Sequence, residues 1–353
     1  VWAYAKKATG PIQAIEPSGA APASVTVAGR TYAIESSAAA YALSDLGQYH
    51  LGDSVTLLLG RSGGAAAVAD ISASAGERVG IVTGVANSSY PDGSGGSYTA
   101  RTVTLLATDG QVYQYQTQGT GLREGSLVRA TVSAQGGQVT LRGLSGASIT
   151  GQVNRDGTKL DKYPFAQGAE ILDVSDNRGA VLYPSRLAGL NLTGRQVRYC
   201  SLNRQGEIET LILSDVTGDA YQYGVLTSME TMGEGMSASY SYEFDVAGQT
   251  YVIPPSTTRY PVSAGPIQIL GDLSDPDRLR PLTAVKSGQL TGNQFAAGGQ
   301  KYSLADNVAV YELRDGKYYL SSLARAEQSG ASLTAWYDKP ESSGGRIRII
   351  VVR

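Results

Sequence analysis

The sequence predicts an all-β protein built as a tandem array of small units. Three observations support this: apolar and polar residues alternate along most of the chain, glycine-containing turns recur at close spacing, and helical patterns are scarce. Alternation with a period of two is typical of strands that bury one face, and clusters of Gly, Asp, Asn and Pro mark strand ends. Only the stretches 37–47 and 184–190 favour a turn or two of helix.

A tight turn followed by a tyrosine-containing strand recurs four times. Each copy has Gly, then Arg or Gln, then any residue, then Tyr, as in "AGRTYAI" at 28–34. Glycine supplies the positive φ that such turns require, and the tyrosine begins the alternating strand. The tyrosines of this turn–Tyr motif are Tyr32, Tyr113, Tyr251 and Tyr302.

Two further elements repeat and divide the chain into about five units of roughly 50–80 residues. Hairpin patterns occupy 51–71, 123–144 and 193–213, and a connecting phrase such as "VGIVTGV" recurs at 79–85, 147–153, 220–226 and 287–293. The predicted units are 1–75, 76–147, 148–218, 219–288 and 289–353.

Two of these units depart from the pattern. The first lacks the connecting phrase, as a partial unit would, and in the third, "DGTKLDKYPF" (156–165) shifts the tyrosine later. The break around "SDVTGD" (214–219) lies between the hairpin that closes the third unit and the strand that opens the fourth. We therefore interpret it as a joint between units and not as a catalytic loop.

Each unit is expected to be a small barrel or sandwich of the SH3-like or OB-like kind. Five or six short strands suit such a fold, and closure removes exposed edges that a flat Tyr- and Val-rich sheet would leave sticky. Strung together, five units predict an elongated rod, and two larger lobes are the alternative.

Composition limits the classes of function. Charged residues are 17% of the 353, below the roughly 25% of average domains, and 22 tyrosines against 3 phenylalanines indicate much exposed β surface. The net charge of −2 offers no basic stripe for nucleic acid. No stretch is long and apolar enough to span a membrane. The opening "VWAYAKKATG" has no signal-peptide pattern, which suggests a processed product or a segment of a longer protein.

Residues that carry catalytic chemistry are few. The single cysteine, Cys200, excludes an intramolecular disulfide and is expected to be a buried apolar residue. His50 is the only histidine, so a multi-histidine metal site is excluded. A Gly-x-Ser-x-Gly match occurs at 60–64, but between strands, whereas a nucleophile elbow needs a strand followed by a helix. We expect no catalytic site and no organic cofactor.

Clustered acidic residues are the remaining candidates for a site. Asp272, Asp275 and Asp277 lie in "GDLSDPDRLRP", which fits either a solvated turn or a calcium loop, because Ca²⁺ takes carboxylate and carbonyl oxygens from irregular loops. Asp173 and Asp176 form a second acidic group. A glycosidase needs only two carboxylates, so a hydrolase is the third-ranked hypothesis.

Two strand patterns favour binding. Tyr240, Tyr242 and Phe244 share one face of a predicted strand, which would suit either stacking on a carbohydrate or packing on a neighbouring unit. The terminal stretches 1–7 and 345–353 are also strand-like. Either could pair with the sheet edge of a second subunit, although a central strand is the simpler interpretation of the last one.

Several segments resemble parts of large surface proteins from anaerobic Gram-positive bacteria that are anchored by S-layer homology domains. These include "EIETLILSDVTGDAYQYGVL", "AVYELRDGKYYLSSL" and "WYDKPESSGGRIRIIVV", and the likeness extends from about residue 25 to the end. The resemblance implies an extracellular β-repeat region at the cell surface. No copy of the anchoring domain itself is evident, which puts direct attachment to the wall in doubt.

Together these observations lead to a functional expectation. We expect a non-enzymatic structural protein that assembles with itself into an extracellular layer or filament. The alternative is a module that binds cell-wall glycan or another polysaccharide through exposed tyrosines.

Overall fold

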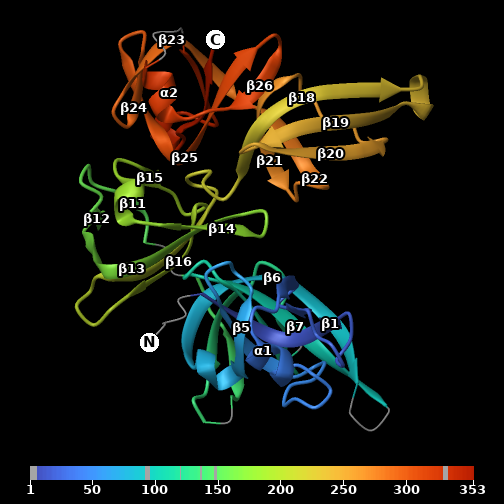
Figure 1. Ribbon diagram of the computed structural model, residues 1–353. Coiled ribbons are helices and arrows are strands. Elements are labelled where there is room, and N and C mark those ends of the chain that lie inside the picture. The colour runs from blue at the N-terminus through green and yellow to red at the C-terminus, as the bar shows by residue number, and fades with distance from the viewer. Residues whose placement is uncertain (1–5, 92–95, 120, 136, 147–148, 329–332) are drawn as a thin grey trace.

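The computed structural model describes residues 6–91, 96–119, 121–135, 137–146, 149–328 and 333–353. Strands make up 58% and helices 7% of the structure, so the predicted all-β class is confirmed. The sheets are stacked in an elongated arrangement (Figure 1).

The N-terminal ten-stranded sheet contains the first two predicted units. Its path is β10-β9-β6-β7-β8-β1-β2-β3, with β4 and β5 joined to β1. The units connect where β1 runs parallel to β8, with Thr9 opposite Tyr113. Each keeps its own apolar core. The elements are β1 Lys7–Glu16, β2 Ser24–Val27, β3 Arg30–Ala33, α1 Ser37–Ala42, β4 Ser54–Leu59, β5 Ala65–Asp70, η1 Ile71–Ser74, β6 Gly76–Pro91, β7 Ser97–Ala107, β8 Val112–Thr117, β9 Leu127–Val132 and β10 Val139–Gly143.

The next part of the chain, 149–214, forms a five-stranded and a two-stranded sheet. In the larger one the order is β12-β13-β17-β16, β14 also pairs with β13, and β13 and β17 are parallel. The elements are β11 Gly151–Gln152, β12 Lys159–Leu160, β13 Tyr163–Ser175, β14 Arg178–Leu182, η2 Pro184–Leu187, β15 Asn191–Leu192, β16 Val197–Leu202 and β17 Ile208–Ser214.

Residues 222–281 form an antiparallel sheet of five strands in the order β20-β19-β18-β21-β22. The first strand, β18, is central and pairs with both β19 and β21, as β6 pairs with β7 and β9 in the second unit. The elements are β18 Gln222–Met232, η3 Gly235–Ser237, β19 Ser239–Val246, β20 Gln249–Ser256, β21 Gly265–Gly271 and β22 Pro276–Pro281.

The last part, 283–352, pairs its strands in a ring. β23 pairs with β24, β24 with β25, β25 with β28 in parallel, β28 with β27, and β27 with β23. The elements are β23 Thr283–Thr291, β24 Gln294–Ala297, β25 Gln300–Arg314, β26 Lys317–Leu320, α2 Leu323–Gln328, β27 Leu333–Tyr337, η4 Glu341–Ser343 and β28 Ile347–Val352.

The turn–Tyr motif forms tight hairpins. At 28–29, 247–248 and 298–299 both turn residues have positive φ, and the flanking residues pair directly. This is the type I′ geometry that matches strand twist. The copy at 109–110 uses a longer loop between β7 and β8. All four tyrosines pack on the apolar core of their own unit.

One of the predicted boundaries falls inside a strand. The boundary at 288/289 falls inside β23, which begins at Thr283. The connecting phrase lies inside the first strand of its unit at 79–85, begins before that strand at 220–226 and extends past its end at 287–293. The phrase therefore indicates the strand but not its bounds.

Residues 76–214 and 222–352 repeat one two-unit module, which we call the first and second module. In the first, Phe165 pairs with Ile208 before the register shifts, and in the second Leu304 pairs with Ile347 before the same shift. The offset is 139 residues for both strands (304 against 165, and 347 against 208). The central strands β6 and β18 share a bulge at matching positions, after Val82 and after Leu226.

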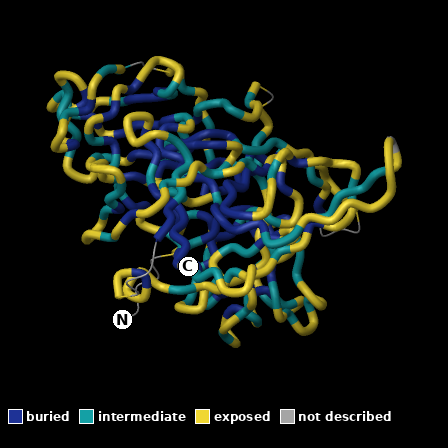
Figure 2. Tube along the Cα trace, turned by 90° about the horizontal axis from the view of Figure 1, so that it is seen from above, coloured by how far each residue is buried: buried dark blue, intermediate teal, exposed yellow. Residues whose placement is uncertain are grey.

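The two halves of each module contact each other in the same way. In the first module Ile81 and Leu106 pack on Leu172 and Ile212 of the following unit. In the second, Val225 and its neighbours pack on Tyr311 and Val351, which lie 139 residues after Leu172 and Ile212. Figure 2 shows buried residues concentrated inside the stack and exposed ones towards its periphery.

The terminal strands are not free edges. β1 pairs with β2, β4 and β8, and β28 lies between β27 and β25 with all its residues buried. The central-strand interpretation of 345–353 is therefore right, and pairing of this strand with a second subunit is wrong. Residues 1–5 of the N-terminal stretch lie outside the described residues.

The structure makes a direct prediction about Gly80. A Cβ there would lie 2.3 Å from the carbonyl oxygen of Leu106, as one at Gly224 would from that of Asp245, whereas the nearest atom at Gly84 on the same strand is 3.6 Å away. Overpacking against backbone costs about 1–3 kcal/mol. Gly80→Ala should therefore lower the free energy of unfolding by about that amount in urea titrations followed by circular dichroism. Gly84→Ala is the matched control, and equal losses in both variants would contradict the assignment.

Candidate functional site

The segment between β17 and β18 is bound by polar contacts from both sides. Asp173 on β13 is fully buried, and its carboxylate accepts hydrogen bonds from the backbone N–H groups of Val216 and Thr217 and from the Thr217 hydroxyl. Burial raises the pKa of Asp173, and these donors offset part of that effect. The predicted joint at 214–219 is thus anchored to the unit that precedes it.

Asp219 binds two arginines from different units. Arg186 of η2 donates through Nε at 2.7 Å and Nη2 at 3.1 Å, and Arg348 of β28 donates through Nη1 at 2.7 Å. Burial alone would raise the pKa of Asp219, but the hydrogen bonds from Arg186 and the charge of Arg348 outweigh it and lower the pKa. The carboxylate therefore stays ionised and holds the two guanidinium groups together.

Arg348 continues the network into the last unit. Its side chain is 1% exposed, and Nη2 donates to Asp338 at 3.0 Å, whose side chain is 2% exposed. The Arg348 guanidinium also lies 4.7 Å from the ring centre of Tyr223. The Tyr223 hydroxyl is 2.9 Å from the Asp338 carboxylate, and burial raises its pKa, so it remains protonated. Three parts of the chain thus meet in one buried ion network.

Hydrogen bonds from side chains to backbone carbonyl groups complete the joint. Arg186 Nη2 donates to the Gly344 carbonyl at 2.8 Å, and Lys339 Nζ donates to the Asp215 carbonyl at 2.9 Å. The loop from Tyr337 to Arg346 therefore reaches across to the earlier unit. Because buried charges are tolerated only when paired and hydrogen-bonded, this geometry fixes the units relative to each other.

The sequence predicts the joint but not the side chains that bind it. The sequence indicates a central strand at 345–353 but does not single out Arg348 within it. The available signal was an arginine inside an otherwise apolar strand, which needs a charged partner when buried. Nothing local identifies that partner, because Asp219 lies 129 residues earlier.

The predicted calcium residues do not form a cluster. Asp272 accepts hydrogen bonds from the N–H and hydroxyl of Ser274, which lower its pKa, and its other oxygen is 3.8 Å from Arg178. Asp275 and Asp277 are exposed. Among the described residues, no group of three or more His, Cys, Asp or Glu is arranged to hold a metal ion.

The other acidic pair is split between two roles. Asp173 binds the joint, while Asp176 is in the exposed turn between β13 and β14 with a φ of 46°. Asp173 is fully buried and committed to three donors, so its carboxylate faces no solvent-accessible substrate position.

The remaining candidates have structural partners. His50 lies 3.9 Å from Asp53, and the Ser62 hydroxyl contacts Glu35. Cys200 is buried in an apolar core, and burial raises its pKa to about 11.

The predicted aromatic face packs inward. Tyr242 and Phe244 are buried in the core of their own unit, and Tyr240 packs against it. Packing of this face on a neighbouring unit is therefore wrong, because the three residues pack within their own unit, and the buried Tyr242 and Phe244 offer no face to a carbohydrate.

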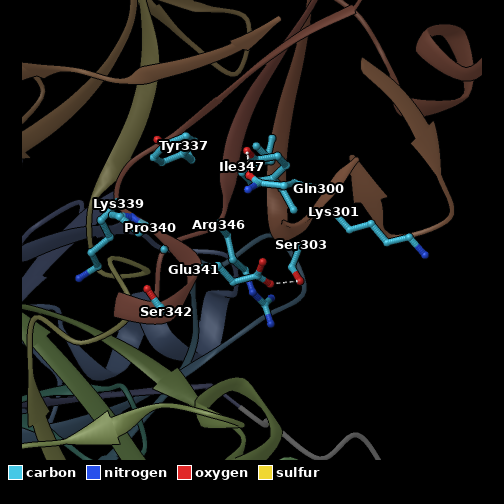
Figure 3. A pocket seen from close by; sticks show the side chains of 12 residues that line it. Gln300, Lys301, Ser303, Tyr337, Lys339, Pro340, Glu341, Ser342, Arg346 and Ile347 are labelled. Carbon is cyan, nitrogen blue, oxygen red and sulfur yellow. Dashed lines mark hydrogen bonds between the residues drawn. The ribbon is translucent and has the colours of Figure 1, made fainter. Parts of the chain in front are cut away.

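One pocket lies beside the joint and combines aromatic, polar and charged groups (Figure 3). It has a volume of about 470 Å³ and lies between the start of β25 and the loop from Tyr337 to Arg346. Tyr302 and Tyr337 stack in its wall with ring centres 6.0 Å apart. The rest of the lining includes Gln300, Lys301, Ser303, Lys339, Glu341, Ser342 and Arg346.

Comparisons with protein families, with curated proteins and with solved structures find no match to this chain. In the part of the chain that the structure describes, no helix has the length and apolar character needed to cross a bilayer.

The ion network predicts a large cost for removing one of its members. Arg348→Met leaves Asp338 buried without its cation, and breaking a buried pair in this way costs about 3–5 kcal/mol. Arg314→Met is the control in the same unit, because Arg314 is 58% exposed and pairs with Glu312 at the surface, where such pairs contribute about 0–1 kcal/mol. Thermal unfolding of both variants checks this, and similar melting temperatures would refute the network's role.

Proposed function

We propose that this protein is a non-enzymatic structural component of the bacterial cell surface that assembles with itself into an extracellular layer or filament. The observation that carries the proposal is the buried ion network formed by Arg186, Asp219, Asp338 and Arg348. Such a network holds successive units in one orientation, as a building block of an ordered array requires. The resemblance to surface proteins supports the location.

The proposal includes the architecture of the single units. We infer that each is a small β-barrel, of the OB-like kind in 283–352. The support is the ring of pairings β23-β24-β25-β28-β27, with α2 placed before β27. A closed ring leaves few unpaired edges, so assembly would use side-chain contacts between faces instead of indiscriminate edge pairing.

Electron microscopy tests the proposal. Purified protein at high concentration, imaged in negative stain, should form ordered sheets or filaments. Imaging with added calcium and then with a chelator shows whether assembly requires the ion. Dispersed single molecules under both conditions would overturn the structural function.

A second function is favoured by the pocket beside the joint. Stacked tyrosines with neighbouring hydroxyl, amide and cationic groups are suited to a polysaccharide, because rings pack on sugar faces and polar groups bind hydroxyls. We propose cell-wall glycan as its ligand.

Sedimentation with insoluble peptidoglycan tests this second function. The double variant Gln300→Ala/Lys301→Ala removes two exposed lining residues and should lower the bound fraction several-fold. The control is Gln249→Ala/Thr250→Ala at the equivalent turn of the preceding unit, where Tyr251 contacts Gln249 as Tyr302 contacts Gln300. Equal binding by both variants would exclude the pocket.

A further inference from the structure

The face that binds the joint in the first module has a counterpart in the second. Asp173 is paired with Ala180 and Leu213, and Glu312 is paired with Tyr319 and Val352, each 139 residues later. An acidic residue therefore occupies the same sheet position in both modules.

The arginine beside it is also repeated. Arg186 of η2 immediately precedes Leu187, which is fully buried, and Arg325 of α2 immediately precedes the buried Ala326, again with an offset of 139. Glu312 itself is hydrogen-bonded to Arg314, and this contact is the main cause that lowers its pKa, with a smaller contribution from the charge of Arg325. The acidic residue and the arginine that bind the joint in the first module thus each have a counterpart in the second.

The two copies of this face differ in exposure. In the first module the side chain of Asp173 is fully buried and that of Arg186 is 10% exposed, because residues 215–219 and Arg348 cover them. In the second module the side chain of Glu312 is 21% exposed, and Arg325 is exposed. No described segment lies over the second face as 215–219 lies over the first.

The uncovered face carries residues typical of interfaces. Tyr319 is 51% and Leu323 37% exposed. Leu320 pairs with Tyr311 and lies near Gly248, so it belongs to the opposite side of this sheet. Tyrosine and arginine are enriched in protein interfaces, and exposed apolar residues mark sites of association. We call Glu312, Tyr319, Leu323 and Arg325 the receiving face.

The surface that would fit it is defined by the same repeat. Within the chain, the second module contributes Arg348 to the joint. The residue 139 positions earlier, at the same place on the parallel strand pair, is Glu209 of β17, which is exposed. Glu77, at the start of the first module, is exposed as well. At the position of Glu209 the first module thus presents an acidic side chain where the second presents an arginine.

We propose that the receiving face binds the first module of a second copy of this chain, with Arg325 facing Glu209 of that copy. This inference rests on the proposed self-assembly and names its contact. In this contact, the second module of one chain and the first module of the next are arranged as the first and second modules are within one chain. Because this contact joins two different faces of the chain, every assembly has one unoccupied face at each end. The assembly can therefore grow as a linear array.

Charge exchange tests the contact in the full chain. Arg325→Glu and Glu209→Arg should each reduce assembly, measured as the sedimenting fraction, at least ten-fold, and the double variant should restore it. Arg142→Glu on β10, an exposed position away from both faces, is the control and should assemble like the unmodified protein. Both altered residues are exposed, so circular dichroism should show unchanged folding.

Mixing the single variants gives an independent result. In an equimolar mixture the receiving face of each variant matches the first module of the other, so the mixture should recover the assembly that each variant loses alone and form alternating chains in analytical ultracentrifugation. If the unmodified protein assembles and neither single variant differs from Arg142→Glu, the receiving face is wrong while the structural function stands. If the unmodified protein does not assemble, both proposals fail.

Discussion

The arrangement of this molecule depends on one partly buried carboxylate shared by two arginines. Asp219 lies in the short segment between two units, and Arg186 and Arg348 reach it from opposite sides. A charge this enclosed is tolerated only if its partners stay in place, so the requirement for pairing becomes a requirement for a fixed orientation. The apolar contacts within each module are less directional, and the joint places one module relative to the other.

The chain uses two different solutions for joining units. Where one unit packs on the next inside a module, glycine allows close approach of the strands and aliphatic or aromatic residues fill the contact. Between modules, hydrogen bonds and ion pairs replace most of this apolar surface. Apolar packing tolerates small shifts, whereas a bidentate arginine contact fixes direction. The polar joint therefore occurs where orientation matters most.

Local features of the fold were accessible from the sequence, and long-range ones were not. The turn–Tyr motif identified hairpins because turn geometry and strand alternation are local properties. The repeat of the two modules is not evident from the sequence because the turn–Tyr segments are offset. The turn before Tyr163 lies two residues closer to the parallel pair at Phe165 than the turn before Tyr302 lies to the parallel pair at Leu304. Arg348 was missed because its partners are distant in sequence, and Tyr242 was ambiguous because one strand's alternation does not say what covers its face.

The sequence separation of the joint also has a consequence for folding order. Arg348 and Asp219 are 129 residues apart, so their contact closes a loop that includes a complete sheet and most of another unit. Such a loop is entropically costly until the intervening residues are themselves folded. During synthesis, Asp219 and its neighbours emerge well before β28, with only Arg186 and Asp173 to hold them. The joint is therefore expected to close late, as a docking step between units that have already formed.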